Sequence, residues 1–150
     1  MAVSIEAVLA FLDQHEPQYG EAVRLGPDAV PHLRRLVREE DPMRASKAAY
    51  LAGLIDGDES PAVLEQALRR DEPAVRVAAA YAAQHLSRAP PELFDRLLSD
   101  YDDGVRRTAL KSIGVSRPSG LTAKVEELAS GDEADHVREL ARETARQLGS

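Results

Sequence analysis

One pattern of about 31 residues occurs four times in this chain, and no other feature constrains its fold as strongly. The clearest copy is PAVLEQALRRDEPAVRVAAAYAAQHL, residues 61–86. It holds a short amphipathic segment, an acidic turn with a proline, and a second amphipathic segment rich in alanine. Similar copies begin at residues 30 and 91, and a more divergent copy covers 122–148. A fixed period of roughly 20–50 residues predicts a stack of repeats.

Each copy predicts two helices, which we call outer (the first) and inner (the second). In the clearest copy Ser60 is expected to cap the outer helix, with Pro61 at its first position. Pro73 disfavours helical geometry in the residue before it and so ends that helix. Alanines dominate the apolar positions of the inner helix. This predicts close packing against the helices on both sides.

One domain of all-α class accounts for the whole chain. Residues 26–148 carry the four repeats, and residues 1–25 predict a shorter, irregular helix pair that caps the open end of the stack. Glycines such as Gly53 and Gly114 are expected at helix ends or at close helix contacts. The last inner helix, residues 135–148, is dense in Arg and Glu, which suits a cap at the opposite end.

Composition narrows the classes of function. The 150 residues include no cysteine, which excludes disulfides and thiolate metal sites and fits a reducing compartment. A formal charge of −7 argues against nucleic-acid binding, which depends on phosphate neutralisation. The first residues lack the pattern of a signal peptide, and no apolar run reaches the ~20 residues needed to cross a membrane. A cytoplasmic protein without nucleic-acid or membrane partners is expected.

The stretch VRVAAAYAA at residues 75–83, preceded by Asp-Glu-Pro at 71–73, resembles the second helix and inter-helix turn of a HEAT repeat. Residues 105–114 and, more weakly, 137–145 are similar. The spacing resembles the short bacterial HEAT-like repeats of the phycobilisome-lyase type. This resemblance implies a right-handed αα-superhelix, a HEAT-like solenoid of about five helix pairs. It also implies a scaffold for partners and leaves their identity open.

An arginine recurs just after each acidic turn, at Arg76, Arg106 and Arg138. Two interpretations stand beside each other: a row that grips an anionic ligand, or structural bonds from each arginine to turn carboxylates of its own or the next repeat. The structural interpretation is favoured, with Asp71 and Asp102 among the acids. In the first copy Ala45 stands at the arginine position, and Arg44 precedes it by one residue.

Tyr50 and Tyr81 each follow two alanines and lie 31 residues apart, so they occupy equivalent places on neighbouring inner helices. Lys111 and Glu143 take that place in the later copies. The resemblance implies that this edge faces a concave groove. Because tyrosine is frequent at binding hot spots, the sequence predicts a partner site made of five residues, Tyr50, Tyr81, His85, Arg107 and Lys111. The alternative is that the two tyrosines pack on each other and cover the alanine-rich helices.

No pattern of catalytic or metal-binding residues is found. The histidines at positions 15, 32, 85 and 136 lie in different elements, without the convergent spacing that a transition metal needs. Phosphate loops, nucleophile elbows and paired-carboxylate motifs are lacking. The cluster Arg34, Arg35 and Arg38 is interpreted as a solvated outer face. We therefore expect no enzyme, no metal and no cofactor.

These observations predict a non-catalytic scaffold that binds a protein or peptide in the groove formed by the inner helices. Its tyrosines would anchor the partner, and Arg107 and Lys111 would pair with acidic groups. The alternative is a small-molecule or cofactor-handling protein of the bilin-lyase-like HEAT class, which would need a closed pocket. Self-association through the outer helices is a third possibility, and a monomer or weak homo-oligomer is expected.

Overall fold

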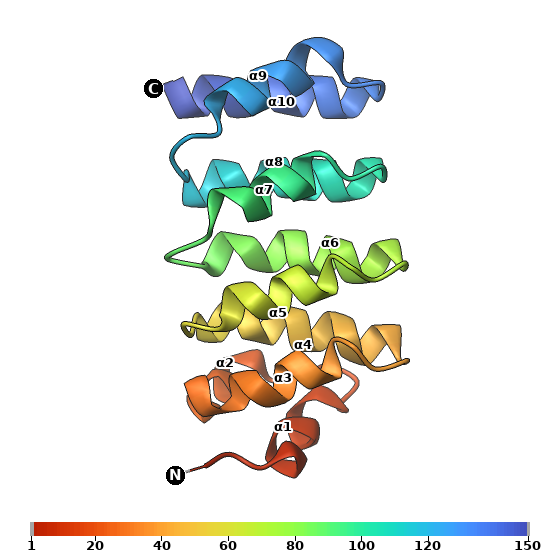
Figure 1. Cartoon of the computed structure of the whole chain (residues 1–150), viewed down its shortest axis with the longest axis vertical. Helices are drawn as coiled ribbons and strands as arrows, with labels where there is room; N and C mark the ends of the chain where they lie inside the picture. Colours follow the sequence, from red (N-terminus) through yellow and green to blue (C-terminus); the bar gives the residue numbers. More distant parts are fainter. Residues whose placement is uncertain (1, 150) are drawn as a thin grey trace.

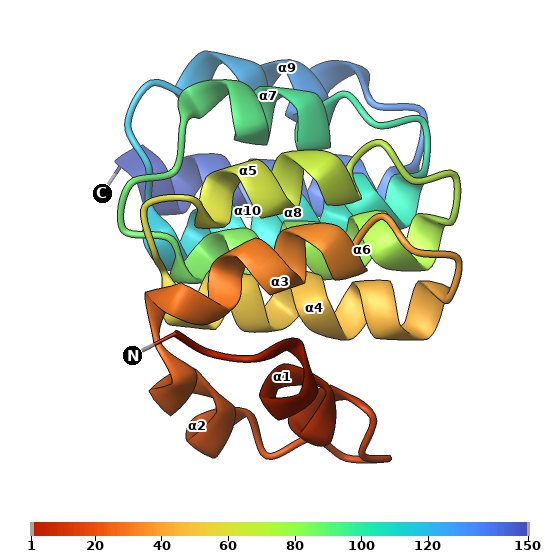
Figure 2. The same cartoon turned by 60° about the horizontal axis from the view of Figure 1, so that its bottom comes forward.

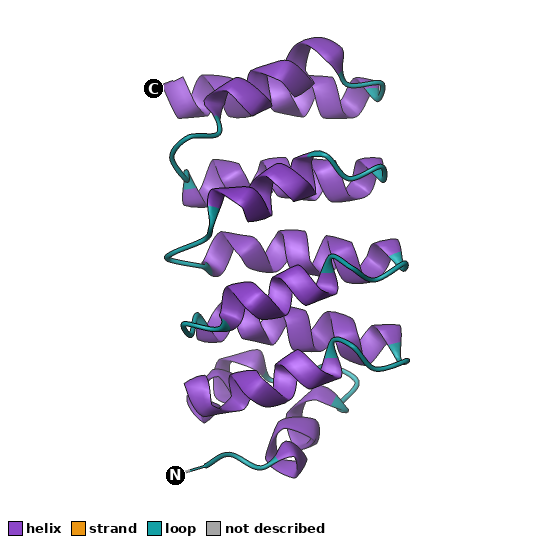
Figure 3. Ribbon diagram, viewed as in Figure 1, coloured by secondary structure: helices purple, strands orange, loops and turns teal. Residues whose placement is uncertain are grey.

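The computed structural model describes residues 2–149, which form helices joined by loops and contain no strand (Figure 1, Figure 3). This confirms the all-α class. The α-helices are α1 (Ile5–Leu12), α2 (Tyr19–Ala22), α3 (Val30–Leu36), α4 (Pro42–Ile55), α5 (Ser60–Ala67), α6 (Pro73–Ala82), α7 (Pro91–Leu98), α8 (Asp103–Ser116), α9 (Thr122–Gly131) and α10 (Asp135–Gly149). Three short 3₁₀ turns are η1 (Val23–Leu25), η2 (Pro27–Ala29) and η3 (Ala83–His85).

The helices of the four repeats lie in two rows. The inner helices α4, α6, α8 and α10 pack each against the next, and α3, α5, α7 and α9 each pack on the inner helix that follows. Figure 2 shows the outer helices together on one side of the inner row. Each helix pair therefore contacts mainly its neighbours along the stack, as repeated sequence copies require.

Small side chains bring the inner helices close together. Ala79, Ala80 and Ala82 of α6 are fully buried. The hydroxyl of Ser112 on α8 donates a hydrogen bond to the carbonyl of Ala80. On the other side of α6, a Cβ built on Gly53 of α4 would lie 2.6 Å from the carbonyl oxygen of Ala82. The larger core side chains come mainly from the outer helices, among them Leu33, Leu36, Leu64, Leu93, Phe94, Leu97 and Leu98.

Two buried arginines join consecutive turns. The Arg76 side chain is 4% exposed; its Nε lies 2.9 Å from the Asp100 carboxylate in the next turn, and its Nη1 donates to two carbonyls of its own turn, those of Arg70 and Asp71. Arg106 repeats the arrangement one pair further on, with Asp132 at 2.8 Å. Its Nη1 donates to the Asp100 carbonyl. Both guanidinium groups are thus occupied within the protein.

Of the expected bonds to turn carboxylates of the same or the next repeat, those to the next repeat are observed for Arg76 and Arg106, but Asp71 and Asp102 are not the carboxylates used. Asp71 contributes its backbone carbonyl to Arg76, not its carboxylate. Asp102 caps the N-terminus of α8 by accepting a hydrogen bond from the Val105 amide. The reason is geometric: each arginine reaches across to the turn of the following pair, where Asp100 and Asp132 lie. Arg138, in the last pair, bonds within its own turn, to the carbonyl of Asp132 and the carboxylate of Asp135.

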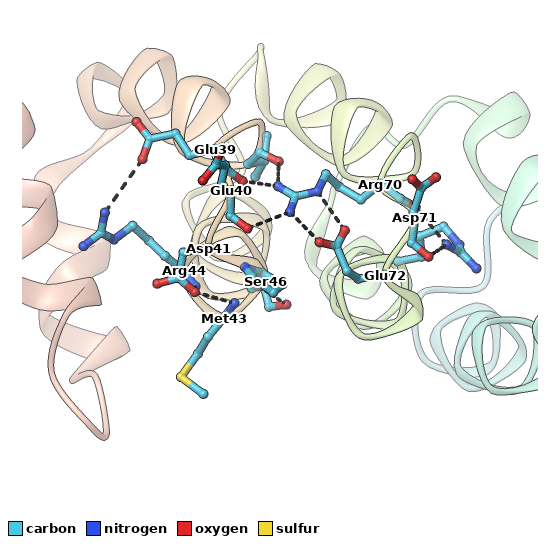
Figure 4. A network of polar contacts seen from close by, with 12 residues as sticks. Glu39, Glu40, Asp41, Met43, Arg44, Ser46, Arg70, Asp71 and Glu72 are labelled. Atoms are coloured by element: carbon cyan, nitrogen blue, oxygen red, sulfur yellow. Dashed lines mark hydrogen bonds and ion pairs between the residues drawn. The ribbon is translucent and has the colours of Figure 1, made fainter.

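Between the first two repeats the bridge runs in the opposite direction (Figure 4). Ala45 occupies the arginine position of α4, so the turn of the first repeat lacks its own donor. Arg70 of the second repeat supplies it by donating to the carbonyls of Glu39 and Glu40 while pairing with Glu72. These two carbonyls are equivalent to those that Arg76 bonds 31 residues later. Equivalent backbone carbonyls are therefore hydrogen-bonded in both turns, in one by an arginine of the same repeat and in the other by an arginine of the next repeat.

Arg44 does not join this arginine row. Its guanidinium makes two hydrogen bonds, of 2.9 and 3.0 Å, to the Asp13 carboxylate just after α1. Ser60 also departs from its predicted role as a cap, because it begins α5 and its hydroxyl accepts a hydrogen bond from the Gly57 amide.

Residues 2–25 close the first end of the stack. Ser4 caps α1, which packs against α3 and α4, and α2 packs against α4. The carbonyl of Val3 accepts a hydrogen bond from the ring of His32 on α3. In Figure 2 both α1 and α2 lie below α4, away from the outer row.

Among the helices of residues 2–149, none combines the length and the apolar content needed to cross a bilayer.

The two inner-helix glycines give a matched test of helix packing. Gly53→Ala is expected to lower the free energy of unfolding by about 1–3 kcal/mol, because the added methyl meets the backbone of α6. In Gly114→Ala the methyl meets only the end of the Gln147 side chain, which can move. That variant should be neutral or gain up to about 1 kcal/mol from helix propensity. Urea unfolding of both variants checks this, and equal losses would contradict the packing described.

Asp132→Asn tests the buried bridge. The variant leaves the Arg106 charge without its counter-ion and is expected to lower the free energy of unfolding by about 3 kcal/mol at pH 7.

The same variant should show a defined pH dependence. Burial acts to raise the pKa of Asp132, but hydrogen bonds from Arg106 and from the Ala134 amide outweigh it and lower this pKa. A lowered folded-state pKa adds stability above the unfolded value of about 3.9, and this stability is lost as the pH falls through the folded value. The difference between wild type and variant should therefore shrink below about pH 4. A constant difference down to about pH 2 would contradict the bridge.

Candidate functional site

The exposed side of the inner row, turned away from α3, α5, α7 and α9, is called the inner face here. One side of α6 packs on α4 through Ala82, and the other side packs on α8 through Ala80. Tyr81 lies between these two contacts, on the side of α6 that faces away from the outer row, and is 49% exposed. Tyr50, Lys111 and Glu143 occupy the equivalent positions of α4, α8 and α10. Lys111 and Glu143 are exposed, and Tyr50 is half-buried.

Four aromatic rings lie together on the part of the inner face nearest the N-terminus. The ring centroid of Tyr50 lies 5.4 Å from that of Tyr81 and 5.9 Å from that of His85. Tyr19 of α2 approaches Tyr50 edge-on at 4.8 Å. Burial first, and the neighbouring phenol second, raises the pKa of the Tyr19 and Tyr50 hydroxyls. The predicted residues Tyr50, Tyr81 and His85 thus lie together, with Tyr19 as a fourth member.

The sequence analysis missed Tyr19. It belongs to the irregular N-terminal pair, which has no repeat to align with, so no template indicates which way its side chain points. The only feature of the sequence that could draw attention to Tyr19 is the rarity of tyrosine, since the chain contains four.

The N-terminal segment covers the inner face of α4 around Lys47 and Tyr50. Besides the contact of Tyr19 with Tyr50, the ammonium group of Lys47 donates hydrogen bonds of 3.1 and 2.9 Å to the carbonyls of Leu12 and Gln14. The chain itself therefore occupies the inner face around Lys47 and Tyr50, whereas Met43 in the first turn of α4 and Tyr81 on α6 stay exposed.

Two cations stand beside Tyr81 on the next helix. Arg107 and Lys111 are exposed, and within residues 2–149 neither has an ion pair or hydrogen bond from its side chain. Lys111 also borders a surface hollow of about 310 Å³ between α8 and α10, whose other walls include Val115, Leu140 and Glu143. The face therefore changes from aromatic to basic to acidic along the stack.

Exposed apolar side chains concentrate on this face. Met43 is 67% exposed and points away from the neighbouring polar network (Figure 4), and Val115 is 66% exposed. Met43 lies seven residues before Tyr50 in α4, and Val115 lies four residues after Lys111 in α8, so helical spacing puts both on the same side of the inner row as Tyr81. Tyr101, in contrast, lies in a turn, where its ring packs under the Arg76 guanidinium at 4.8 Å.

His85 carries an unusual polar atom. Its Nε2 is buried and has no hydrogen-bond partner among the described residues. Burial of a ring nitrogen without a partner costs free energy, and native proteins contain few such groups.

The remaining histidines and the outer arginine cluster lie elsewhere. His136 pairs with Asp103 at 2.6 Å between the starts of α10 and α8, and His15 is exposed in the loop after α1. Within residues 2–149, no three His, Asp or Glu side chains are grouped so that they could hold a metal ion. Arg34 and Arg35 of α3 and Arg38 in the turn just after it are exposed on the outer row.

No protein-family model matches this chain, and no curated protein matches it in a sequence search.

The unpaired nitrogen makes His85→Phe informative. Phenylalanine keeps a ring against Tyr50 and Tyr81 but removes the polar atom, so the free energy of unfolding should rise by about 1 kcal/mol. His85→Ala, which also loses the ring contacts, should be less stable than His85→Phe. Thermal unfolding compares the three proteins. A lower melting temperature for His85→Phe than for wild type would show that Nε2 is satisfied in solution.

Proposed function

We propose that this chain is a short, right-handed HEAT-like solenoid that binds a protein or peptide segment on its inner face and has no catalytic role. The four stacked helix pairs and the arginine bridges between their turns support the HEAT-like assignment. They are the features that the sequence resemblance leads one to expect, and they carry no information about the partner.

The observation that carries the binding proposal is the gathering of exposed apolar side chains on one face. Met43, Tyr81 and Val115 are large, apolar and exposed, and all three lie on the inner face. Single exposed apolar residues need no explanation. Here they stand on three neighbouring inner helices, α4, α6 and α8, where a partner lying across the stack would contact all three. Burial of these side chains by a partner would contribute roughly 25 cal/mol per Å² of apolar surface.

Charge supports the same face. The chain carries a net charge of −7, yet Arg107 and Lys111 stand beside Tyr81 without an ion pair in the described part of the chain. A basic pair next to an aromatic anchor favours a partner with acidic groups, which it would orient and attract at low ionic strength. Tyr81 offers a large contact area with a polar tip and would supply the desolvated centre.

The chain offers a matched pair of variants for the test. Arg107→Glu with Lys111→Glu reverses two exposed charges, four residues apart, on the inner face. Arg34→Glu with Arg38→Glu makes the same change in charge and spacing on the outer row. Both should melt like wild type, since none of these four side chains makes a hydrogen bond or ion pair within residues 2–149.

Each protein is then used as bait in lysate of the source organism. Proteins captured by wild type should be retained by the outer variant and lost by the inner variant. Capture that survives in the inner variant and fails in the outer variant would move the site to the convex side and contradict the proposal.

A further inference from the structure

We infer that the partner segment presents a tyrosine flanked by carboxylates, in the way that the chain's own residues 16–21 do. This inference rests on the proposed function, because it names the chemistry of what the inner face binds. Two independent observations carry it: the occupant that the first repeat already holds, and the charges that surround the open part of the face.

The first observation is the internal occupant. Residues 16–21 read Glu-Pro-Gln-Tyr-Gly-Glu, and their tyrosine, Tyr19, packs edge-on against Tyr50 at 4.8 Å. Tyr81 stands at the equivalent position one repeat further, is 49% exposed, and has no such covering ring from the described N-terminal segment. The inner face thus binds a tyrosine-bearing segment at Tyr50, and the equivalent position at Tyr81 is open to a second segment of this kind.

The second observation is charge complementarity. At the first repeat the carboxylates of Glu16 and Glu21 are exposed and have no ion pair among the described residues. Beside the exposed ring of Tyr81 the unpaired charges are positive, since Arg107 and Lys111 are cations that pair with no anion of residues 2–149. A segment of the same composition placed on Tyr81 would bring together groups that remain unpaired in the isolated chain.

The spacing also fits. Neighbouring packed helices lie about 8–10 Å apart, so a basic side chain of α8 is about that far from a ring stacked on α6. An extended segment advances about 3.3 Å per residue, which places its carboxylate about three residues from its tyrosine. In the internal occupant Glu16 lies three residues before Tyr19 in the non-helical stretch, as this spacing requires, whereas Glu21 lies two residues after it within α2.

The probe is a synthetic peptide of residues 15–22, titrated into the full-length, ¹⁵N-labelled protein and followed by amide chemical shifts. It should perturb Tyr81, Arg107 and Lys111. Two altered peptides define the chemistry, one with Glu16→Gln and Glu21→Gln, the other with Tyr19→Ala. Each should bind at least about tenfold more weakly.

Protein variants give the reciprocal control. Arg107→Glu with Lys111→Glu should weaken the parent peptide at least about tenfold and leave the Gln-containing peptide almost unaffected. Arg34→Glu with Arg38→Glu should change neither affinity.

The outcomes separate this inference from the proposed function. Equal affinity of all three peptides for the inner face would overturn the tyrosine-acid preference and leave a peptide-binding face in place. Shifts confined to Lys47 and Tyr50 would mean that the peptide only displaces the chain's own segment, and would overturn the assignment of Tyr81. No shifts at millimolar peptide, or shifts only on the outer row, would also overturn the inference, while the capture experiment judges the proposed function separately.

Discussion

The buried guanidinium that ties one turn to the next is the interaction on which the stacking of the helix pairs depends. Arg76 and Arg106 each satisfy carbonyls of their own turn and a carboxylate of the following turn, so they fix the offset between neighbouring pairs. At that offset the small side chains of α6 and α8 meet at close range, where the Ser112 hydroxyl donates a hydrogen bond to the Ala80 carbonyl. In the first turn Arg70 of the next repeat donates to the equivalent carbonyls, so what these turns share is the pair of backbone acceptors and not the position of the arginine.

This packing also decides which residues are available for binding. Because both flanks and the outer side of α4, α6 and α8 are buried, only one side of these helices remains free, and equivalent positions form a line along the stack. That line runs from Tyr50 through Tyr81 to Lys111 and Glu143. The N-terminal segment covers its beginning and leaves the aromatic-to-basic boundary open. The candidate site therefore follows from the stacking and from a small number of side chains that vary between repeats.

Much of this arrangement could be predicted from the sequence. The period gives the helix pairs, and the equivalence of Tyr50 and Tyr81 within that period is enough to place them side by side. A bridge from Arg106 to an acid in the turn of the next repeat is one of the two interpretations of the sequence, and Asp132 is that acid. The Asp100 carboxylate that pairs with Arg76 could not be predicted in this way, because the acids indicated near that turn are Asp102 and Asp103. Nor could the ring of Tyr19, which lies outside the repeats and lacks an equivalent position.

Site-specific photocrosslinking in living cells of the source organism would show which face of this protein meets a partner. A photoreactive phenylalanine derivative would replace Tyr81 on the inner face or, as the control, Arg38 on the outer row. We expect discrete crosslinked products from position 81 and none from position 38. Products from position 38 alone, or no product from position 81, would contradict the claim that the inner face is where this protein meets its partner.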